Sequence, residues 1–304
     1  MDHLQAIRVF ARVIETGSFN QAARSLEMPG STVSKWVADL EAGLGVKLLE
    51  RSTRKIGVTA AGALYYDSTR RLMAELDDLE STLGQGQASP RGMLRVDCGG
   101  ATASALLIPA LPAFCARYPD IDLRLTVNDR NADLLSDNID CAIRSGADDP
   151  TLVSRLLGQS RWTTCASPAW LSRYGTPTTP QQISAAKMPV VSYFSSTSGL
   201  AHRLEFEKDA ERISLQHLGT RVAVNESNAH LAAALAGLGL IQTADFIVRP
   251  HLASGALVAV LADWERPPLQ IYLAYLPSRR DNARVKAFSA WATGLLRAEQ
   301  PGQT

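Results

Sequence analysis

The chain has few of the residues that redox and metal chemistry require. Its four cysteines are separated by 17, 26 and 24 residues, without a Cys-x-x-Cys pair, and no two of its five histidines are four residues apart. No metal site is therefore predicted. In a reducing compartment the thiols are most simply small buried hydrophobes. The four are Cys98, Cys115, Cys141 and Cys165.

Net charge, long apolar runs and a leader sequence are also missing. A net charge of +1 gives no bulk attraction to nucleic acid, so any DNA affinity has to come from local clusters. The apolar runs fall far short of the roughly 20 residues that span a membrane, and the first residues lack the pattern of a secretion signal. We therefore expect a cytoplasmic protein without a membrane partner, and 46% hydrophobic content is ample for two or three cores.

The sequence gives little support to catalysis. The Gly-x-Gly stretch at 237–239 lacks the third glycine and the strand-to-helix placement of a dinucleotide loop, and the one at 43–45 reads as the end of a helix. The chain is therefore predicted not to be an enzyme and to need no cofactor.

The strongest pattern lies in residues 18–62 and begins with two short helices. Ser18, followed three residues later by Gln21, forms a capping box that starts a helix with a small Ala22-Ala23 face. After a four-residue break, apolar side chains recur at positions 33, 37, 40 and 44, which indicates a second amphipathic helix. Its opposite face presents small hydroxyls and a cation. A helix-turn-helix is predicted, with the second helix able to enter a DNA major groove.

A cationic cluster follows the second helix. Four cations and one anion between residues 47 and 55 give a local charge of +3, and residues 51–59 read as a turn with two small strands. A β-wing there would carry Arg51 and Arg54 to the DNA backbone and minor groove. A solvated charge run is the alternative.

The order of residues from Gly17 to Gly62 resembles that of the LysR-type transcriptional regulators, and the resemblance runs nearly end to end. Two positions depart from the family pattern. Pro29-Gly30 stands where Ser-Gln often opens the recognition helix, so a hydroxyl cap is missing there. Trp36 replaces a frequent Gln and either packs on the neighbouring helix or lies on a phosphate. A winged helix-turn-helix is expected over residues 1–58. The expected DNA-binding residues are Ser18, Gly30, Ser31, Thr32, Ser34, Lys35, Arg51, Thr53 and Arg54.

A linker helix and hinge are expected over residues 59–90. Thr59 can cap this helix, and apolar side chains at 65, 72, 76, 79 and 83 form a coiled-coil stripe. The stripe could pack on its own domain, but the Gly- and Gln-rich segment 84–90 after it offers nothing to bury against. Pairing with a second copy is therefore predicted. Two recognition helices would then read an interrupted inverted repeat in double-stranded DNA.

Beyond residue 91 strands and helices alternate, which is typical of an α/β domain with a mostly parallel sheet covered on both faces. The expected elements are strands at 93–98, 121–127, 139–144, 189–193, 221–224, 240–243 and 270–276, and helices at 102–118, 132–137, 228–236 and after 281. The resemblance implies a two-lobed, Rossmann-like effector domain similar to periplasmic solute-binding proteins. It would span 91–304, with lobe I at about 91–163 and 268–304 and lobe II at about 164–267.

Topology locates the cleft, because ligands in open α/β sheets bind at the carboxyl ends of strands, beside helix N-termini. Bare backbone N–H groups near Gly100 and the guanidinium of Arg144 would favour an anionic effector, which Glu226 would partly oppose. Each residue has a structural alternative as a cap, ion-pair partner or loop. The expected effector-binding residues are Gly100, Ala101, Thr102, Arg144, Ser145, Ser195, Ser196, Glu226, Asn228 and Thr243.

The resemblance further implies a homotetramer made of two coiled-coil dimers, with RNA polymerase as a further candidate partner. A small-molecule effector would shift the population between two assembly geometries and so change the bend in the DNA. Two alternatives stay open. One is a cytoplasmic small-molecule-binding protein or enzyme whose N-terminal helices serve protein contacts. The other is a regulator that responds to oxidants through its cysteines.

Overall fold

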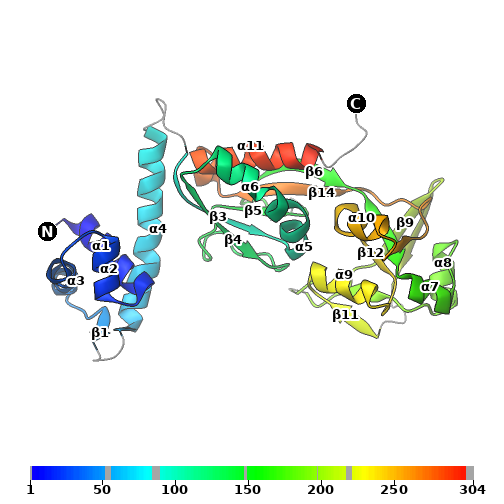
Figure 1. Ribbon diagram of the computed structural model, residues 1–304, viewed down its shortest axis with the longest axis horizontal. Helices are drawn as coiled ribbons and strands as arrows, with labels where there is room; N and C mark the ends of the chain where they lie inside the picture. Colours follow the sequence, from blue (N-terminus) through cyan, green and yellow to red (C-terminus); the bar gives the residue numbers. More distant parts are fainter. Residues whose placement is uncertain are drawn as a thin grey trace. The chain divides into compact units, whose positions relative to one another are not determined.

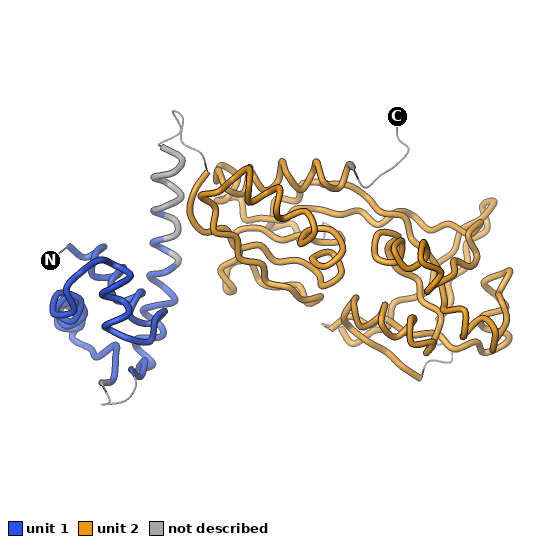
Figure 2. The backbone as a smooth tube through the Cα atoms, viewed as in Figure 1, with its two compact units in different colours: residues 1–84 blue, residues 85–304 orange. Residues whose placement is uncertain are grey.

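The computed structural model describes residues 2–51, 56–83, 90–146, 149–196, 198–216 and 221–298. For residues 51, 71, 74, 75 and 77–83 it describes the backbone but not the side chains. The chain divides into two compact units, residues 1–84 and residues 85–304 (Figure 2).

Unit 1 is a small helical domain with a two-stranded hairpin. Its elements are α1 (His3–Thr16), α2 (Phe19–Ser25), α3 (Gly30–Leu44), β1 (Leu49–Arg51), β2 (Ile56–Val58) and α4 (Ala60–Leu83) (Figure 1). The core contains Phe10 from α1, Ala22 from α2, and Val33, Val37 and Leu40 from α3. These α3 residues recur at steps of four and three, so one face of α3 is buried and the other is left to solvent.

The helix boundaries follow from local chemistry. The Ser18 hydroxyl accepts a hydrogen bond from the Gln21 backbone N–H at 3.4 Å, as the capping pattern predicts. Pro29 precedes α3 without a side-chain cap, which confirms the expected loss at that position. The Thr59 hydroxyl accepts a hydrogen bond from the Gly62 N–H at 2.9 Å and so caps α4.

Unit 2 begins with a five-stranded sheet in the order β4-β3-β5-β14-β6. The strands are β3 (Gly92–Cys98), β4 (Ile121–Val127), β5 (Cys141–Arg144), β6 (Val153–Ser160) and β14 (Leu269–Tyr275). The first three are parallel to one another, whereas β14 is antiparallel to both β5 and β6. Because β6 is antiparallel to β14, it runs in the direction of the first three strands, so four of the five strands point the same way and only β14 is opposed. The sheet is therefore mostly parallel, as predicted.

One face of this sheet carries the main core of unit 2. The continuous helix after β3 comprises α5 (Gly100–Thr102), a π-helical turn (Ala103–Leu107) and α6 (Ile108–Arg117). It lies beside α11 (Ala283–Ala298), where the Phe114 ring centroid is 5.8 Å from that of Phe288 (Figure 1). On the other face, Ala142 contacts Leu134 and Ile139. Among the residues that the structure describes, helices therefore cover one face of the sheet and turns lie on the other, so the expectation of helices on both faces is wrong.

The second lobe contains the remaining strands of unit 2. A three-stranded antiparallel sheet has β7 (Trp162–Ala166) between β12 (Ile241–Ala244) and β13 (Val258–Ala259), and β8 (Val191–Tyr193) pairs in parallel with β11 (Val222–Val224). A hairpin, β9 (Leu204–Lys208) with β10 (Glu211–Leu215), was not predicted. The helices are α7 (Pro168–Tyr174), α8 (Pro180–Ala185), α9 (Ser227–Leu235) and α10 (Asp245–Ala253), and a 3-10 turn (Pro277–Arg279) precedes α11.

The predicted helix at 132–137 is a series of turns instead. The Asp133 carboxylate accepts hydrogen bonds from the N–H groups of Leu135 and Ser136, at 2.9 and 3.1 Å. An aspartate that bonds to the backbone two and three residues ahead competes with helix formation.

One described helix, Gly100–Arg117, is long and apolar enough to cross a membrane by length and composition, with a mean hydropathy of 1.2. The sequence expectation of only short apolar runs missed it. Leu106, Leu107 and Phe114 of this helix are buried in the core of the five-stranded sheet, and a core helix of a folded domain passes the same test.

Candidate functional site

The exposed face of α3 is the first candidate site. Gly30, Ser31 and Lys35 are exposed, and Thr32 and Ser34 are half-buried. The N-terminus of α2 lies close by, because a Cβ atom built on Gly30 would be 3.9 Å from the Asn20 Oδ1. Asn20 is exposed and adds an amide to this face, although it was not among the predicted residues.

A buried carboxylate connects α3 to the hairpin. Glu41 is 6% exposed and its Oε1 accepts hydrogen bonds from the N–H groups of Leu48 and Leu49, at 2.9 and 3.1 Å. Lys47 Nζ lies 2.6 Å from its Oε2. Burial opposes ionisation of Glu41, but the hydrogen bonds from Lys47 and the two N–H groups outweigh it and lower the pKa. The hairpin therefore starts at a fixed position relative to α3.

The remaining predicted DNA-binding residues fall into two groups. Ser18 is half-buried and caps α2. Thr53, Arg54 and the Arg51 side chain lie outside the described residues. Trp36 packs against the core of unit 1, which favours the packing interpretation over a phosphate contact.

Helix α4 uses its apolar residues in two ways. The Tyr65 ring lies 5.8 Å from that of Phe10 and packs on the core of unit 1, so it belongs to its own domain rather than to a pairing stripe. Leu64 and Leu72 are 71% and 63% exposed, which is unusual for leucine and leaves an apolar surface uncovered. The Leu79 and Leu83 side chains lie outside the described residues.

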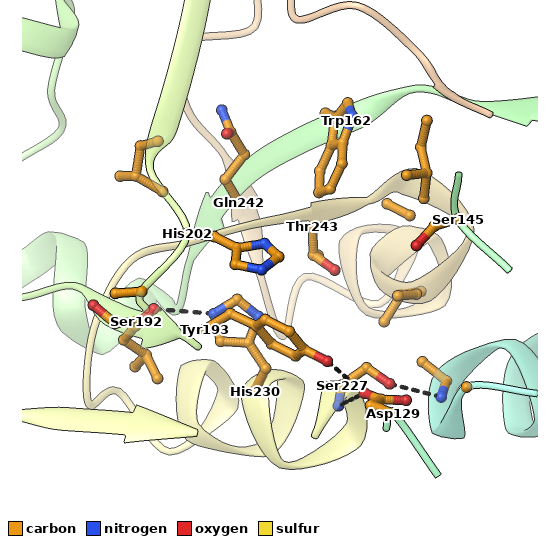
Figure 3. A pocket seen from close by; sticks show the side chains of 18 of the residues that line it. Asp129, Ser145, Trp162, Ser192, Tyr193, His202, Ser227, His230, Gln242 and Thr243 are labelled. Carbon is orange, nitrogen blue, oxygen red and sulfur yellow. Dashed lines mark hydrogen bonds between the residues drawn. The ribbon is translucent and has the colours of Figure 1, made fainter. Parts of the chain in front are cut away.

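The second candidate site is a cavity of about 640 Å³ between the two lobes of unit 2. The carboxyl ends of β3 and β5, the strands β7 and β12, and the segments around β8 and α9 line it (Figure 3). Its location matches the rule that ligands of α/β sheets bind beyond the carboxyl ends of strands.

Asp129, in the loop after β4, joins the two lobes at the edge of the cavity. Its Oδ1 accepts a hydrogen bond from the Gly100 N–H at 2.7 Å. Its Oδ2 accepts hydrogen bonds from the Ser227 N–H at 2.5 Å and from the Tyr193 hydroxyl at 2.9 Å (Figure 3). Burial and the Asp129 charge raise the pKa of Tyr193, so its hydroxyl remains a donor.

Arg144 is partnered by an aspartate that sequence reasoning did not identify. Its Nη1 lies 2.5 Å from Asp97 Oδ2, and its Nη2 donates to the Ala132 carbonyl at 3.2 Å. The Asp97 side chain is fully buried, and burial raises its pKa despite the opposing charge of Arg144. Asn128, next to Asp129, donates to Asp97 at 3.3 Å. Arg144 therefore helps to hold the loop that carries Asp129.

Aromatic and imidazole rings line the inner part of the cavity. The Tyr193 ring centroid is 5.3 Å from that of His202 and 5.6 Å from that of His230 (Figure 3). Burial lowers the pKa of both histidines, so both are neutral near pH 7. The Arg266 guanidinium stacks over Trp162, with its Cζ atom 3.9 Å from the ring centroid, and its Nε lies 3.2 Å from Glu205 Oε2.

The structure brings together half of the predicted effector-binding residues. Ala101, Thr102, Arg144, Ser145 and Thr243 line the cavity. The other five, Gly100, Ser195, Ser196, Glu226 and Asn228, are not among its lining residues. Glu226 instead caps α9 through the N–H groups of Asn228 and Ala229. The rings of Trp162, Tyr193 and His202 were missed. They come from strands and loops, and the periodicity of a sequence does not show how such segments pack together.

Three of the four cysteines are positioned as structural residues. Cys98, Cys141 and Cys165 are buried, whereas Cys115 is exposed, so the expectation of a buried thiol is wrong at that position. Burial raises the pKa of Cys98 and of Cys165 to about 12 and that of Cys141 well above its usual value. A thiol that stays protonated reacts slowly with oxidants.

Comparisons with known proteins cover both units of the chain. Residues 4–63 match the family described as "Bacterial regulatory helix-turn-helix protein, lysR family", and residues 87–297 match the "LysR substrate binding domain". The chain is a LysR-type transcriptional regulator. It is therefore a DNA-binding regulator with an effector-binding domain, and it is not an enzyme.

Individual relatives cover nearly the whole chain. An HTH-type transcriptional repressor of Pseudomonas aeruginosa is 37% identical over 99% of this chain and 94% of its own length. The transcriptional activator AaeR of Escherichia coli is 32% identical over 90% of this chain and 88% of its own. The solved structure of CrgA, a LysR-type regulator from Neisseria meningitidis, superimposes with a TM-score of 0.61 at 28% identity, covering 96% of this chain and 98% of that one. One relative is described as a repressor and another as an activator.

Proposed function

We propose that this LysR-type regulator binds an interrupted inverted repeat as a dimer or tetramer, and that a small molecule in the interlobe cavity of unit 2 changes its activity on DNA. The observation that supports this most is the exposed face of α3, where Ser31, Ser34 and Lys35 lie opposite a fully buried apolar face. The protein works in the cytoplasm, where its operator and RNA polymerase are.

Direct readout is assigned to the hydroxyls of α3. Thr32 and Ser34 can hydrogen-bond to base edges in the major groove, and Lys35 can neutralise a phosphate. Arg51, Thr53 and Arg54 of the wing are proposed to reach the backbone and minor groove.

Dimerisation is assigned to α4. Its exposed residues Leu64 and Leu72 are an apolar surface that pairing would cover, as in coiled coils. Two such dimers would form the tetramer. A ligand then only has to shift a balance in which DNA bending contributes on the order of 1 to 6 kcal/mol.

Footprinting of bound genomic fragments tests the operator geometry. We expect two protected half-sites related by inverted symmetry, and Ser34→Ala should relax base preference at one position per half-site. Protection of a single, unrepeated segment would contradict dimeric binding. Leu72→Glu tests the assembly by sedimentation: it should shift the protein toward monomer, whereas the control Leu156→Glu, at an exposed leucine of β6, should not.

The redox alternative has weaker support. Three of the four cysteines are buried and carry raised pKa values, so a reactive thiolate is not favoured at those positions. DNA binding before and after mild peroxide treatment tests it: unchanged affinity agrees with structural thiols, and a reversible loss would favour redox sensing.

A further inference from the structure

The two lobes of unit 2 meet along a seam of small residues beside the cavity. On the first lobe the seam comprises Gly100, Ala101 and Ser104, and on the second it comprises Ser227 and Asn228. The Ala101 N–H donates to the Ser227 hydroxyl at 2.8 Å, and the Ser104 hydroxyl donates to Asn228 Oδ1 at 2.9 Å. The lobes are thus in direct contact on this side of the cavity.

Gly100 shows how close this contact is. A Cβ atom at Gly100 would lie 2.1 Å from Glu226 Oε1 and 2.8 Å from Asn228 Nδ2. A side chain fits there only if the Glu226 and Asn228 side chains of the opposite lobe move away. The glycine that was predicted to expose its N–H to a ligand instead permits contact with the opposite lobe.

The Asp129 carboxylate occupies the position where a ligand anion is expected. It receives one hydrogen bond from its own lobe, from the N–H of Gly100, and two from the opposite lobe, from the N–H of Ser227 and the hydroxyl of Tyr193. Two of these donors are backbone N–H groups in the first turn of a helix, which favour negative charge. The carboxylate that they bind belongs to the protein itself.

Arg144, the cationic side chain predicted to bind an effector, is also paired with a carboxylate of the protein. Arg144 lies 2.5 Å from the buried carboxylate of Asp97, which also accepts a hydrogen bond from Asn128, the neighbour of Asp129. The chain's own carboxylates therefore satisfy both of the groups that the sequence assigned to an anionic effector.

We propose that Asp129 is a resident substitute for a ligand carboxylate: it fills the anion position between the lobes and holds this side of the cleft closed before any effector binds. An effector therefore binds the ring-lined part of the cavity around Trp162, Tyr193 and His202. A ligand carboxylate gains the interlobe position only by displacing Asp129. This inference rests on the proposed function only where it takes the cavity as the effector site. The contacts that close the lobes lie within unit 2 and do not depend on that function.

Chemical rescue in the full-length protein tests this inference. Asp129→Ala removes the carboxylate and leaves a gap of its size between the two helix N-termini. Hydrogen exchange at the N–H groups of Gly100, Ala101 and Ser227, followed by mass spectrometry of the peptides that contain them, should become about tenfold faster or more, because the variant lacks the charged acceptor whose hydrogen bonds join the lobes. Sodium acetate should restore slow exchange, and sodium chloride at the same ionic strength should not.

Three further variants make the test specific. Asp122→Ala removes an exposed carboxylate from β4, the strand that precedes the Asp129 loop, and should leave exchange at the seam unchanged. Gly100→Ala should also speed exchange, because its Cβ displaces the Glu226 and Asn228 side chains of the opposite lobe, but acetate should not rescue it, because no carboxylate-sized gap is created. Asp129→Asn keeps the size of the side chain and removes its charge, so it covers the case in which Asp129→Ala does not fold, and it should also speed exchange at the seam.

Wild-type exchange rates in Asp129→Ala would overturn the proposal, as would equal effects of acetate and chloride. The exchange result is independent of DNA, so its failure leaves the proposed operator binding untouched, and an absent footprint would not affect the closure of the two lobes.

Discussion

The DNA-binding unit has one apolar core directly behind its candidate surface, whereas the effector-binding unit has its candidate cavity between two lobes. In unit 1, Val33, Val37 and Leu40 hold α3 from behind, and Glu41 holds the start of the hairpin. In unit 2 the lobes meet through hydrogen bonds to Asp129 and between small residues on one side of the cavity, and Phe246 of α10 packs into the core of the first lobe. A packed surface keeps one shape, whereas a seam of hydrogen bonds can open, which suits a domain that responds to a ligand.

The largest effect is expected from Arg144→Ala, which leaves the buried Asp97 carboxylate without its cationic partner. The loss should be about 3 to 5 kcal/mol of unfolding free energy in unit 2, because a buried charge is left without its partner. Hydrogen exchange during urea denaturation reports the two units separately, and unit 1 should be unaffected. Arg124→Ala, at an exposed arginine 3.9 Å from Asp122, should cost no more than about 0.5 kcal/mol.

The Arg144→Ala defect should depend on pH. Burial raises the pKa of Asp97, so the folded state disfavours its ionised form, and the variant should regain stability as the pH falls through that raised pKa. An equal loss of unfolding free energy at neutral and acidic pH would mean that impaired packing, not an unpaired buried charge, is responsible.

Glu41→Ala tests how the hairpin is held in unit 1. Two buried N–H groups, those of Leu48 and Leu49, lose their acceptor, so unit 1 should lose about 2 to 4 kcal/mol of unfolding free energy. Because the pKa of Glu41 is lowered from 4.5, its contribution is present above pH 4.5 and is lost as the pH falls through the folded-state pKa. Glu41→Gln should remove that pH dependence. Urea denaturation at several pH values measures both, and an unchanged pH profile in Glu41→Gln would contradict the assignment.

Gly62→Ala probes the close approach of α4 to the hairpin. A Cβ atom at Gly62 would lie 2.0 Å from the Leu48 carbonyl oxygen, so the two segments must separate, and a loss of about 1 to 3 kcal/mol in unit 1 is expected. The matched control is Gly43→Ala in α3, where the added Cβ meets no atom within 4 Å apart from its chain neighbours and the backbone of its own helix, and alanine should stabilise the helix by about 0.5 to 1 kcal/mol. Equal effects of the two substitutions on thermal unfolding would refute the packing argument.

The smallest effect is expected from Lys35→Ala, which removes a cation from the exposed face of α3 that is proposed to bind DNA. Affinity for all duplexes should fall alike, and the slope of log affinity against log salt should become shallower by about 0.9 for each phosphate that the variant no longer neutralises. Lys286→Ala, at an exposed lysine of unit 2 paired with Asp281, serves as the control and should change neither quantity. A change in base preference instead would assign Lys35 to base readout.

The sequence predicted unit 1 better than unit 2 for a physical reason. Helix periodicity and the capping pair Ser18 and Gln21 are local signals, and the short range between residues 18 and 62 contains nearly all of them. The close approach of Gly62 to Leu48 had no signal beyond the family pattern, because the distance depends on tertiary packing.

In unit 2 the local signals located seven of the described strands, missed β6, β7, β9, β10 and β13, and did not indicate which strands pair. The direction of β14 and the hairpin of β9 with β10 depend on contacts between distant segments. Asp129 follows β4 in an irregular loop, and its three donors come from positions 100, 193 and 227, so neither spacing nor composition reveals the contact. Arg144 was selected correctly as a lining residue, whereas its partner Asp97 was hidden inside a strand that reads as apolar.

Binding of the purified protein to a selected duplex and to a random duplex, measured across a range of salt concentrations, tests the central claim that the exposed face of α3 docks on DNA. Roughly four to eight phosphate contacts per dimer predict a log–log slope of about −4 to −7, with tighter binding to the selected duplex at every salt concentration. A flat slope, or equal affinity for the two duplexes, would contradict it.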